Sequence, residues 1–289
     1  MKPAPFKYLA PRSLEEALAA LQEHGYDAKL LAGGQSLIPV MNFRLAQPGV
    51  LIDVNHIPGL DGIAANGRLR IGALARHYQL EHDPMVAAFA PLIHQTMPHV
   101  AHPQIRNRGT LGGTLAHADP AAELPVVMVA LNGRFHLQKV GGERWVDADD
   151  FFIGLFATDL GIDEMIVEVE VPPLPPHTGT AFHEVARRHG DYALAGVTAV
   201  VTLDESGNCQ SARLVYLNAG EGPVTAVKAA EILAGQPLTD TLIAEAAQMA
   251  ANEEITPEGD IHATADFKRH LAKVLTQRAL KEAKTKAEG

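Results

Sequence analysis

The chain has 289 residues, of which 47% are hydrophobic and 20% charged, and its formal net charge is −10 at pH 7. This composition is typical of a soluble globular protein, and the length allows about two domains. The acidic balance argues against nucleic acid and anionic membrane surfaces as partners, because both bind through Lys and Arg. The N-terminus lacks the apolar segment of a signal peptide, and no apolar run approaches the roughly 20 residues that cross a bilayer. We therefore expect a cytoplasmic protein without membrane insertion.

Cysteine and histidine usage limits the metal chemistry of the chain. A single cysteine, Cys209, cannot hold an iron–sulfur cluster or a cysteine-based zinc site. His94, His99, His102 and His117 are candidate ligands, but their spacing fits no strong zinc motif. We expect no metal in this chain.

The first 55 residues predict a helix, strand, helix, strand unit. Ser13 is a candidate N-cap with Glu16 three residues later, and Gly25 is a stop signal, so a helix is expected over 13–24. "AKLLAGG" and "VLIDV" are typical of short buried strands. "SLIPVMNFR" predicts a second helix with Ser36 as its N-cap.

The next segments predict a strand at "RLRIGAL", a helix over about 84–99, and a helix at "PAAELPVVMVAL" leading into another strand. Asp119 before Pro120 is a natural N-cap for the latter helix. The proline-rich stretch at 171–179 predicts a stiff linker, with a ligand for a polyproline-binding domain as the alternative.

The remainder predicts three strands followed by helices. "AFHEVAR", "AGVTAVVTL" and "SARLVYL" are the strands, and "DESGNCQ" joins the last two as a hairpin. Helices are expected over 224–234, 239–252 and about 264–283. The apolar face of the last helix indicates core packing and comprises Phe267, Leu271, Val274, Leu275 and Leu280.

Two stretches of matching design, "KLLAGGQSL" and "RNRGTLGGTLAHADP", each place two glycines beside hydroxyl side chains. Adjacent glycines leave backbone N–H groups uncovered, and a helix that starts directly afterwards adds its positive dipole end. Each loop alone could be an ordinary turn, whereas two of the same design favour a shared pyrophosphate site. Neither is a Walker loop, and neither fits the G-x-G-x-x-G pattern of a Rossmann site.

"LAGGQSLIPVMNFRLAQPGVLIDV" and "HPQIRNRGTLGGTLAHADPAAELP" resemble the FAD-binding medium subunit of the molybdenum hydroxylases, a family that includes carbon monoxide, xanthine and nicotine dehydrogenases. The resemblance covers essentially the whole chain. It implies an α+β fold with a vanillyl-alcohol-oxidase (PCMH) type FAD-binding domain at 1–175, built of two α/β subdomains at about 1–55 and 56–175. A C-terminal domain at 176–289, with a three-stranded antiparallel sheet and a helical bundle, is implied after it.

The resemblance also implies where FAD binds. Gln35 stands where some members have histidine, and Thr114 stands where many have asparagine, and both retain a hydrogen-bonding side chain. Covalent attachment is not expected, because neither residues 30–37 nor residues 110–114 contain histidine or cysteine. The implied cofactor contacts are Leu30, Leu31, Ala32, Gly33, Gly34, Gln35, Ser36, Leu37, Val100, Ala101, Ile105, Thr110, Gly112, Gly113, Thr114, Asp119, Glu123, Ile166 and Tyr192.

Several of these residues have a second interpretation. Helix capping alone explains Asp119, and the helix dipole alone explains Glu123. Tyr192 lies beside the flavin ring or is a buried core tyrosine. Val100, Ala101, Ile105 and Ile166 line the ring or adenine site, or are plain core. Arg106 and Arg108, which the resemblance does not assign, are candidates for fixing the loop or facing a partner.

In the family, a small substrate, such as an N-heteroaromatic compound, is hydroxylated at a molybdopterin centre on a large subunit. Electrons then pass through [2Fe–2S] clusters on a small subunit to this FAD and on to an external acceptor. The resemblance implies a dimer of such heterotrimers, and it names no catalytic side chain in this chain. The alternatives are a stand-alone FAD-dependent reductase or oxidase of the same fold, and a non-catalytic nucleotide-binding protein.

Overall fold

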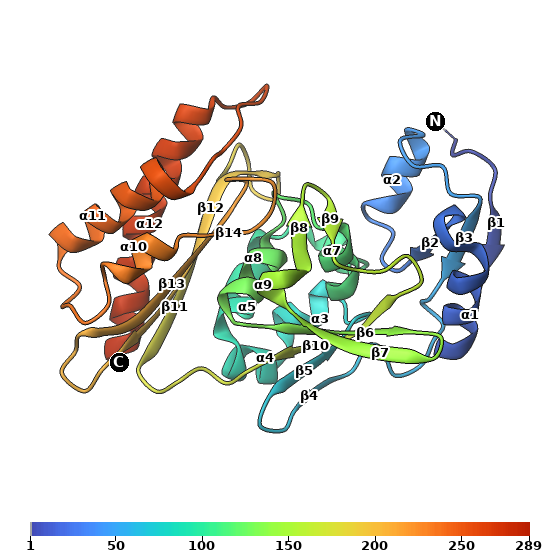
Figure 1. Cartoon of the computed structure of the whole chain (residues 1–289), viewed down its shortest axis with the longest axis horizontal. Coiled ribbons are helices and arrows are strands. Elements are labelled where there is room, and N and C mark those ends of the chain that lie inside the picture. Colours follow the sequence, from blue (N-terminus) through green and yellow to red (C-terminus); the bar gives the residue numbers. More distant parts are fainter. Residues whose placement is uncertain (1) are drawn as a thin grey trace.

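The computed structural model describes residues 2–289 (Figure 1). The blue N-terminal part lies at one end of the molecule, the green middle part follows, and the orange and red C-terminal part lies at the other end. Each part contains its own β-sheet with helices packed against it.

The N-terminal part is a three-stranded parallel sheet with the order β1-β3-β2. Its elements are β1 (Lys7–Leu9), α1 (Leu14–His24), the 3-10 turn η1 (Gly25–Asp27), β2 (Ala28–Leu31), α2 (Leu37–Asn42) and β3 (Val50–Asp53). The predicted helix, strand, helix, strand order is confirmed, and β1 is an additional strand. The Ser13 hydroxyl accepts from the N–H of Glu16, as predicted. Ser36 precedes α2 but caps no N–H group, because its own backbone is helical rather than extended.

The middle part is a five-stranded antiparallel sheet with the order β4-β5-β10-β6-β7, covered by short helices. Its strands are β4 (Ile63–Ala65), β5 (Leu69–Gly72), β6 (Arg134–Lys139), β7 (Gly142–Asp147) and β10 (Met165–Val171), and β8 (Phe152–Gly154) pairs with β9 (Ala157–Thr158). Its helices are α3 (His77–His82), α4 (Pro84–Phe89), α5 (Pro91–Thr96), η2 (Met97–His99), α6 (Pro103–Arg106), α7 (Leu111–His117), α8 (Glu123–Ala130) and α9 (Ala148–Phe151).

The single helix predicted over 84–99 is wrong, because the segment forms α4, α5 and η2 in succession. Ala90 leaves the helical region with φ −131° and ψ 66° between α4 and α5. The cause is Pro91, which disfavours a helical conformation in the residue before it and has no N–H group for an intrahelical bond.

The C-terminal part begins after the proline-rich residues 172–177, which form no regular element. Its elements are β11 (Thr178–Ala186), β12 (Ala193–Leu203), β13 (Cys209–Leu217), β14 (Val224–Thr225), α10 (Val227–Glu231), α11 (Asp240–Met249), the π-turn η3 (Ala250–Glu254) and α12 (Ala265–Glu288). The hairpin between β12 and β13 is confirmed. The antiparallel sheet has four strands instead of the three expected, since Val224 and Thr225 pair with Tyr216 and Val215 before the helix begins.

Three hydrophobic cores hold these parts. One lies between α1 and the parallel sheet and includes Met165 and Val167 of β10. The second fills the middle part, includes Val169 and Val171 of the same strand, and continues into the C-terminal sheet at Val215 and Leu217. The third lies between the C-terminal sheet and its helices, where Leu275 and Leu280 of α12 are buried as predicted. Phe267 is 47% exposed and lies outside this core. Because β10 contributes to two cores, it fixes the N-terminal part against the middle part.

Candidate cofactor site

The first glycine loop, residues 32–36, connects β2 to α2 and leaves a row of backbone donors free. Gly34 has a φ of +72°, a left-handed conformation that glycine adopts without steric cost. Among residues 2–289, no protein atom accepts a hydrogen bond from the N–H groups of residues 33–37. Successive N–H groups around a left-handed residue form a concave anion site, so this loop is suited to a phosphate.

The second glycine loop, residues 109–114, uses its backbone donors within the protein. The N–H groups of residues 111–114 donate to the carbonyl oxygens of Ala75, Ala73 and Thr110 and to the Thr110 hydroxyl, at 2.8–3.2 Å. The two loops therefore look alike in the sequence but differ in what they offer to a ligand.

The two loops touch each other at Gly33. A Cβ atom on Gly33 would lie 2.9 Å from Cα of Gly109 and closer still to the carbonyl oxygen of Arg108. Since both neighbours are backbone atoms, a larger residue at position 33 would force the loops apart. Glycine at this position is therefore explained by the contact between the loops.

The paired glycines of the second loop differ from each other in their surroundings. A Cβ atom on Gly112 would lie 2.7 Å from Cβ of Ala73, so Gly112 allows α7 to pack closely on the segment after β5. Gly113 faces the first loop, where its Cβ would lie 3.8 Å from Cβ of Ala32, and it would crowd only the Thr110 hydroxyl, at 2.7 Å. Gly113 is thus the member of the pair that borders the space between the loops.

A buried histidine, His77 at the start of α3, holds the Thr114 hydroxyl. Its Nε2 lies 3.1 Å from the Thr110 carbonyl oxygen and 3.0 Å from Thr114 Oγ1. Burial lowers the pKa of His77 to about 4, so the ring is neutral at pH 7. Because a carbonyl oxygen can only accept, we assign the hydrogen to Nε2, and Thr114 Oγ1 then accepts from it as well. The hydroxyl hydrogen of Thr114 is left to donate to a ligand.

Asp119 does not cap the helix predicted after it. Its Oδ1 accepts from the N–H of Ala121 at 2.9 Å, and α8 begins only at Glu123. Asp119 therefore stabilises a turn between α7 and α8, a local bond that competes with helix formation. The prediction that Pro120 lies in the first helical turn is wrong for the same reason.

Glu123 begins α8 as a buried acid. Burial, followed by the neighbouring Glu184 carboxylate, raises the pKa of Glu123 to about 8. Glu184 lies on β11, with Oε1 at 3.4 Å from His99 Nδ1, and its Oε2 has no hydrogen-bond partner within residues 2–289. A protonated carboxyl group can both donate and accept, so Glu123 is able to pair with a hydroxyl group in either sense.

Arg106 fixes the segment that contains Val100, Ala101 and Ile105. Its Nη1 donates to the carbonyl oxygens of Val100 (3.0 Å) and Ala101 (3.1 Å), and its Nε donates to Glu81 (2.7 Å). Ala101 has a φ of +48°, Val100 is buried and Ile105 is half-buried. Arg106 therefore fixes the segment at residues 100–101, and its contacts do not reach residues 109–114.

Tyr192 follows a loop of the C-terminal part that packs on residues 101–102. A Cβ atom on Gly190 would lie 2.6 Å from His102 Cε1 and 2.7 Å from the Ala101 carbonyl oxygen. The Tyr192 side chain is 71% exposed, which excludes the buried core tyrosine that was its alternative. Tyr192 is therefore free to contact a ligand held near residues 100–105.

The remaining predicted contacts lie at the edges of the site or in the core. Leu30 and Leu31 are half-buried at the end of β2, and Leu37 is half-buried at the start of α2. Ile166 is 4% exposed on β10 and packs in the core of the middle part, as its alternative interpretation stated.

Three polar residues beside the two loops, Asn55, Arg76 and His77, were not predicted from the sequence. Asn55 contacts the carbonyl oxygens of Leu31 and Ala32, where the first loop begins. Arg76 contacts the carbonyl oxygen of Arg108, just before the second loop, and His77 contacts that of Thr110 within it. Asn55 follows the buried strand β3, and a polar residue just past a buried strand is the one local signal that marks it. Arg76 and His77 carry no such signal, since only the fold brings them to residues 108–114.

The residues around the loops fit a dinucleotide with a diphosphate. The first loop offers free N–H groups, Thr114 offers a hydroxyl hydrogen, and two arginines lie beside them without carboxylate partners among residues 2–289. These are Arg76 and Arg108, neither of which is among the arginines that form ion pairs with carboxylates. Hydrogen-bond donors and unneutralised positive charge are what a diphosphate requires.

Two features are absent from the part of the chain that the structure describes. No group of three or more His, Cys, Asp or Glu side chains among residues 2–289 is arranged to hold a metal ion. No helix in the same range is both long and apolar enough to span a membrane. His117, one of the histidines considered above, packs against Phe156 with ring centroids 5.2 Å apart.

The chain matches two protein families along its length. Residues 4–174 match the family described as the FAD binding domain in molybdopterin dehydrogenase. Residues 180–283 match the CO dehydrogenase flavoprotein C-terminal domain.

Individual relatives agree with this. The 6-hydroxypseudooxynicotine dehydrogenase complex subunit alpha of Paenarthrobacter nicotinovorans is 42% identical, over 98% of this chain and 96% of that protein. The solved structure of carbon monoxide dehydrogenase from Hydrogenophaga pseudoflava contains a chain with 38% identity and a TM-score of 0.95, covering 99% of both chains. A chain of quinoline 2-oxidoreductase from Pseudomonas putida 86 has 39% identity and a TM-score of 0.95, with 100% of both chains covered. The protein is thus a member of the family of FAD-binding medium subunits of the molybdenum hydroxylases.

Proposed function

We propose that this chain is the FAD-carrying electron-transfer subunit of a heterotrimeric molybdenum hydroxylase. Its partners are a large molybdopterin subunit and a small [2Fe–2S] subunit, in a dimer of heterotrimers in the cytoplasm. The substrate is a small N-heteroaromatic compound, because one structural relative acts on quinoline and one sequence relative on 6-hydroxypseudooxynicotine. Electrons arrive from a cluster of the small subunit and leave to an external acceptor.

The observation that carries this proposal is the contact between a glycine loop with free N–H groups and a second loop that presents the Thr114 hydroxyl. The FAD diphosphate lies between these loops. Its contacts are with residues from Leu30 to Leu37 in the first and from Thr110 to Thr114 in the second. The division into an FAD-binding domain at 1–175, with subdomains at about 1–55 and 56–175, and a C-terminal domain at 176–289 belongs to the same proposal.

The flavin and its chain extend from the loops toward the C-terminal part. Glu123 and Asp119 form hydrogen bonds with hydroxyl groups of the flavin side chain, and Tyr192 lies against the flavin ring. Val100, Ala101 and Ile105 line the ring or the adenine. FAD supplies the redox chemistry, while this chain supplies binding, orientation and electrostatics. No side chain is assigned an acid–base role.

Expression with and without the partner subunits tests the proposal. Alone, the chain is expected to purify with FAD but to oxidise no N-heteroaromatic compound with any acceptor dye. Co-expressed, the three subunits are expected to purify together in equal amounts and to reduce the dye when quinoline or a related compound is added. Substrate-dependent dye reduction by the isolated chain would establish the stand-alone enzyme instead. Absence of FAD from both preparations would contradict the cofactor assignment.

A further inference from the structure

Arg76 connects the second glycine loop to the N-terminal part of the chain. It lies between β5 and α3 and is half-buried. Its Nη1 donates to the carbonyl oxygen of Arg108, and its Nη2 donates to Oδ1 of Asn55 at 2.6 Å. One guanidinium group therefore contacts residues from both sides of the proposed cofactor site.

Asn55 continues this connection to the first glycine loop. Its Nδ2 donates to the carbonyl oxygens of Ala32 at 2.8 Å and Leu31 at 3.2 Å. Its own backbone N–H donates to Oδ1 of Asp53 at 2.9 Å, which fixes the residue at the end of β3. The Arg76–Asn55 bridge thus runs from the carbonyl groups before Gly33 to the carbonyl group of Arg108, whose oxygen is the atom that a Cβ on Gly33 would meet first.

The bridge also keeps a positive charge beside the loops. Arg76 donates its hydrogen bonds to neutral acceptors, and it makes no ion pair with a carboxylate within residues 2–289. Burial, followed by the nearby Arg108 charge, lowers the pKa of Arg76 from its ordinary value of 12.5. An anion between the loops would relieve this repulsion between two arginines.

We infer that Arg76 and Asn55 are positioning residues that hold the two glycine loops at the separation that the FAD diphosphate requires. The inference rests on the proposed FAD site. Loops that are already held in place lose less conformational freedom when the ligand binds, so the affinity is higher. Without the bridge, the packing contact at Gly33 still joins the loops, but it includes no hydrogen bond.

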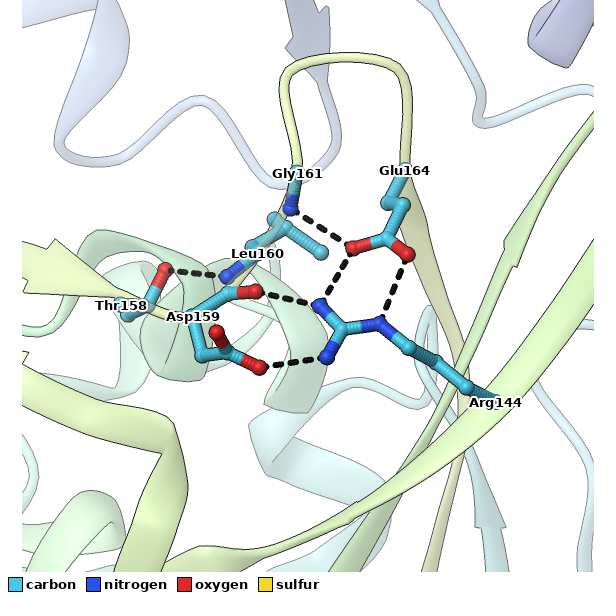
Figure 2. Close-up of polar contacts among 6 residues, drawn as sticks. All are labelled: Arg144, Thr158, Asp159, Leu160, Gly161 and Glu164. Atoms are coloured by element: carbon cyan, nitrogen blue, oxygen red, sulfur yellow. Dashed lines mark hydrogen bonds and ion pairs between the residues drawn. The ribbon is translucent and has the colours of Figure 1, made fainter.

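A second arginine in the same part of the chain provides a matched control (Figure 2). Arg144 on β7 donates to both oxygens of Glu164, at 2.8 and 2.7 Å, and also to Asp159. Like Arg76 it holds a loop in place through several hydrogen bonds, as Figure 2 shows for residues 158–164. Unlike Arg76, it is neutralised by carboxylates and contacts neither glycine loop.

The experiment compares four variants of the full chain with the wild type: Arg76→Met, Arg76→Lys, Asn55→Ala and Arg144→Met. Two quantities are measured for each, the dissociation constant of FAD from quenching of flavin fluorescence and the melting temperature of the apoprotein. Arg76→Met is expected to weaken FAD binding by about tenfold or more. Arg76→Lys is expected to recover less than half of the lost affinity for FAD, measured as the logarithm of the dissociation constant, because an ammonium group does not reproduce the fork geometry of a guanidinium group. Asn55→Ala weakens binding by about fivefold without a change of charge.

The control and the salt dependence separate positioning from general stability and from charge. Arg144→Met is expected to lower the melting temperature while the dissociation constant stays within about twofold of the wild type. Asn55→Ala should retain the wild-type salt dependence of binding, whereas Arg76→Met should reduce it. The inference is overturned if Asn55→Ala leaves FAD binding unchanged, if Arg76→Lys binds like the wild type, or if Arg144→Met weakens FAD binding as much as Arg76→Met. Failure of the wild type to bind FAD would instead contradict the proposed function.

Discussion

The two glycine loops have nearly the same pattern in the sequence, yet one keeps its N–H groups free and the other does not. In the first loop, the donors of residues 33–37 meet no acceptor among residues 2–289. In the second, the segment of Ala73 to Arg76 runs alongside and accepts from Leu111 and Gly112. A pair of glycines therefore does not by itself indicate an anion site. A glycine loop can bind an anion only if no other segment of the chain accepts hydrogen bonds from its N–H groups.

The largest expected effect is that of Gly33→Val, which acts on the loop with free donors. The added side chain collides with the backbone of residues 108–109, so the loops separate. FAD occupancy is expected to fall by at least about tenfold, and the free energy of unfolding to fall by roughly 1–3 kcal/mol. The measurements are the ratio of flavin to protein absorbance and urea denaturation of the apoprotein.

Gly113→Ala is a milder test of the same space, because the added Cβ faces Ala32 of the first loop and crowds the Thr110 hydroxyl that caps α7. It is expected to cost about 1 kcal/mol of stability and to lower FAD occupancy less than Gly33→Val does. Stoichiometric FAD in Gly33→Val would show that the contact between the loops does not set the site.

A smaller effect, confined to acid pH, is expected from His77→Gln beneath the second loop. The folded-state pKa of about 4 lies below the ordinary value of 6.5, so the unfolded chain binds more protons between these values. Stability from this group is present above pH 6.5 and is lost as the pH falls toward 4, by on the order of 3 kcal/mol. Because glutamine does not titrate, the His77→Gln protein does not lose this stability at acid pH.

Urea denaturation of both apoproteins at pH 8, 6 and 4.5 measures the effect of His77. The wild type is expected to be the more stable protein at pH 8, and the difference should shrink steadily on acidification. A difference that stays constant with pH would mean that His77 does not titrate in this range.

The smallest effect is expected from Thr114→Val, which removes one hydroxyl and changes no backbone donor. Loss of a hydrogen bond of about 1 kcal/mol weakens FAD binding by about fivefold. Thr114→Ser keeps the hydroxyl and is expected to bind like the wild type in the same fluorescence titration. Equal affinity of Thr114→Val and the wild type would mean that the second loop shapes the site without contacting the diphosphate.

Features with local signals could be predicted from the sequence. Ser13 and Gly25 bound α1, the hairpin between β12 and β13 follows its turn residues, and the first glycine loop lies between β2 and α2 as expected, although α7 begins at Leu111, before the second pair of glycines. In each case the residues that determine the structure are within a few positions of one another.

Features that depend on distant segments could not be predicted. Asp119 has the sequence of an N-cap, but it lies in a turn between α7 and α8, where the carbonyl oxygen of Pro120 accepts from the N–H of the distant Asn218. Val224 has the pattern of a helix start, but it pairs with Tyr216 of β13 and extends the sheet instead. Arg76 and His77 show no pattern of a binding site, because Thr110 and Arg108, which they contact, come more than thirty positions later.

The place of β10 in its sheet determines when the N-terminal and middle parts can be completed during synthesis. It is the last strand of the five-stranded sheet to be made, but it lies in the centre, between β5 and β6. Until residues 165–171 have left the ribosome, both neighbouring strands have an unpaired edge, which is a site for association with other chains. The core under α1 also lacks Met165 and Val167 until then. The two glycine loops are translated early, but the framework that brings them together is complete only after residue 171.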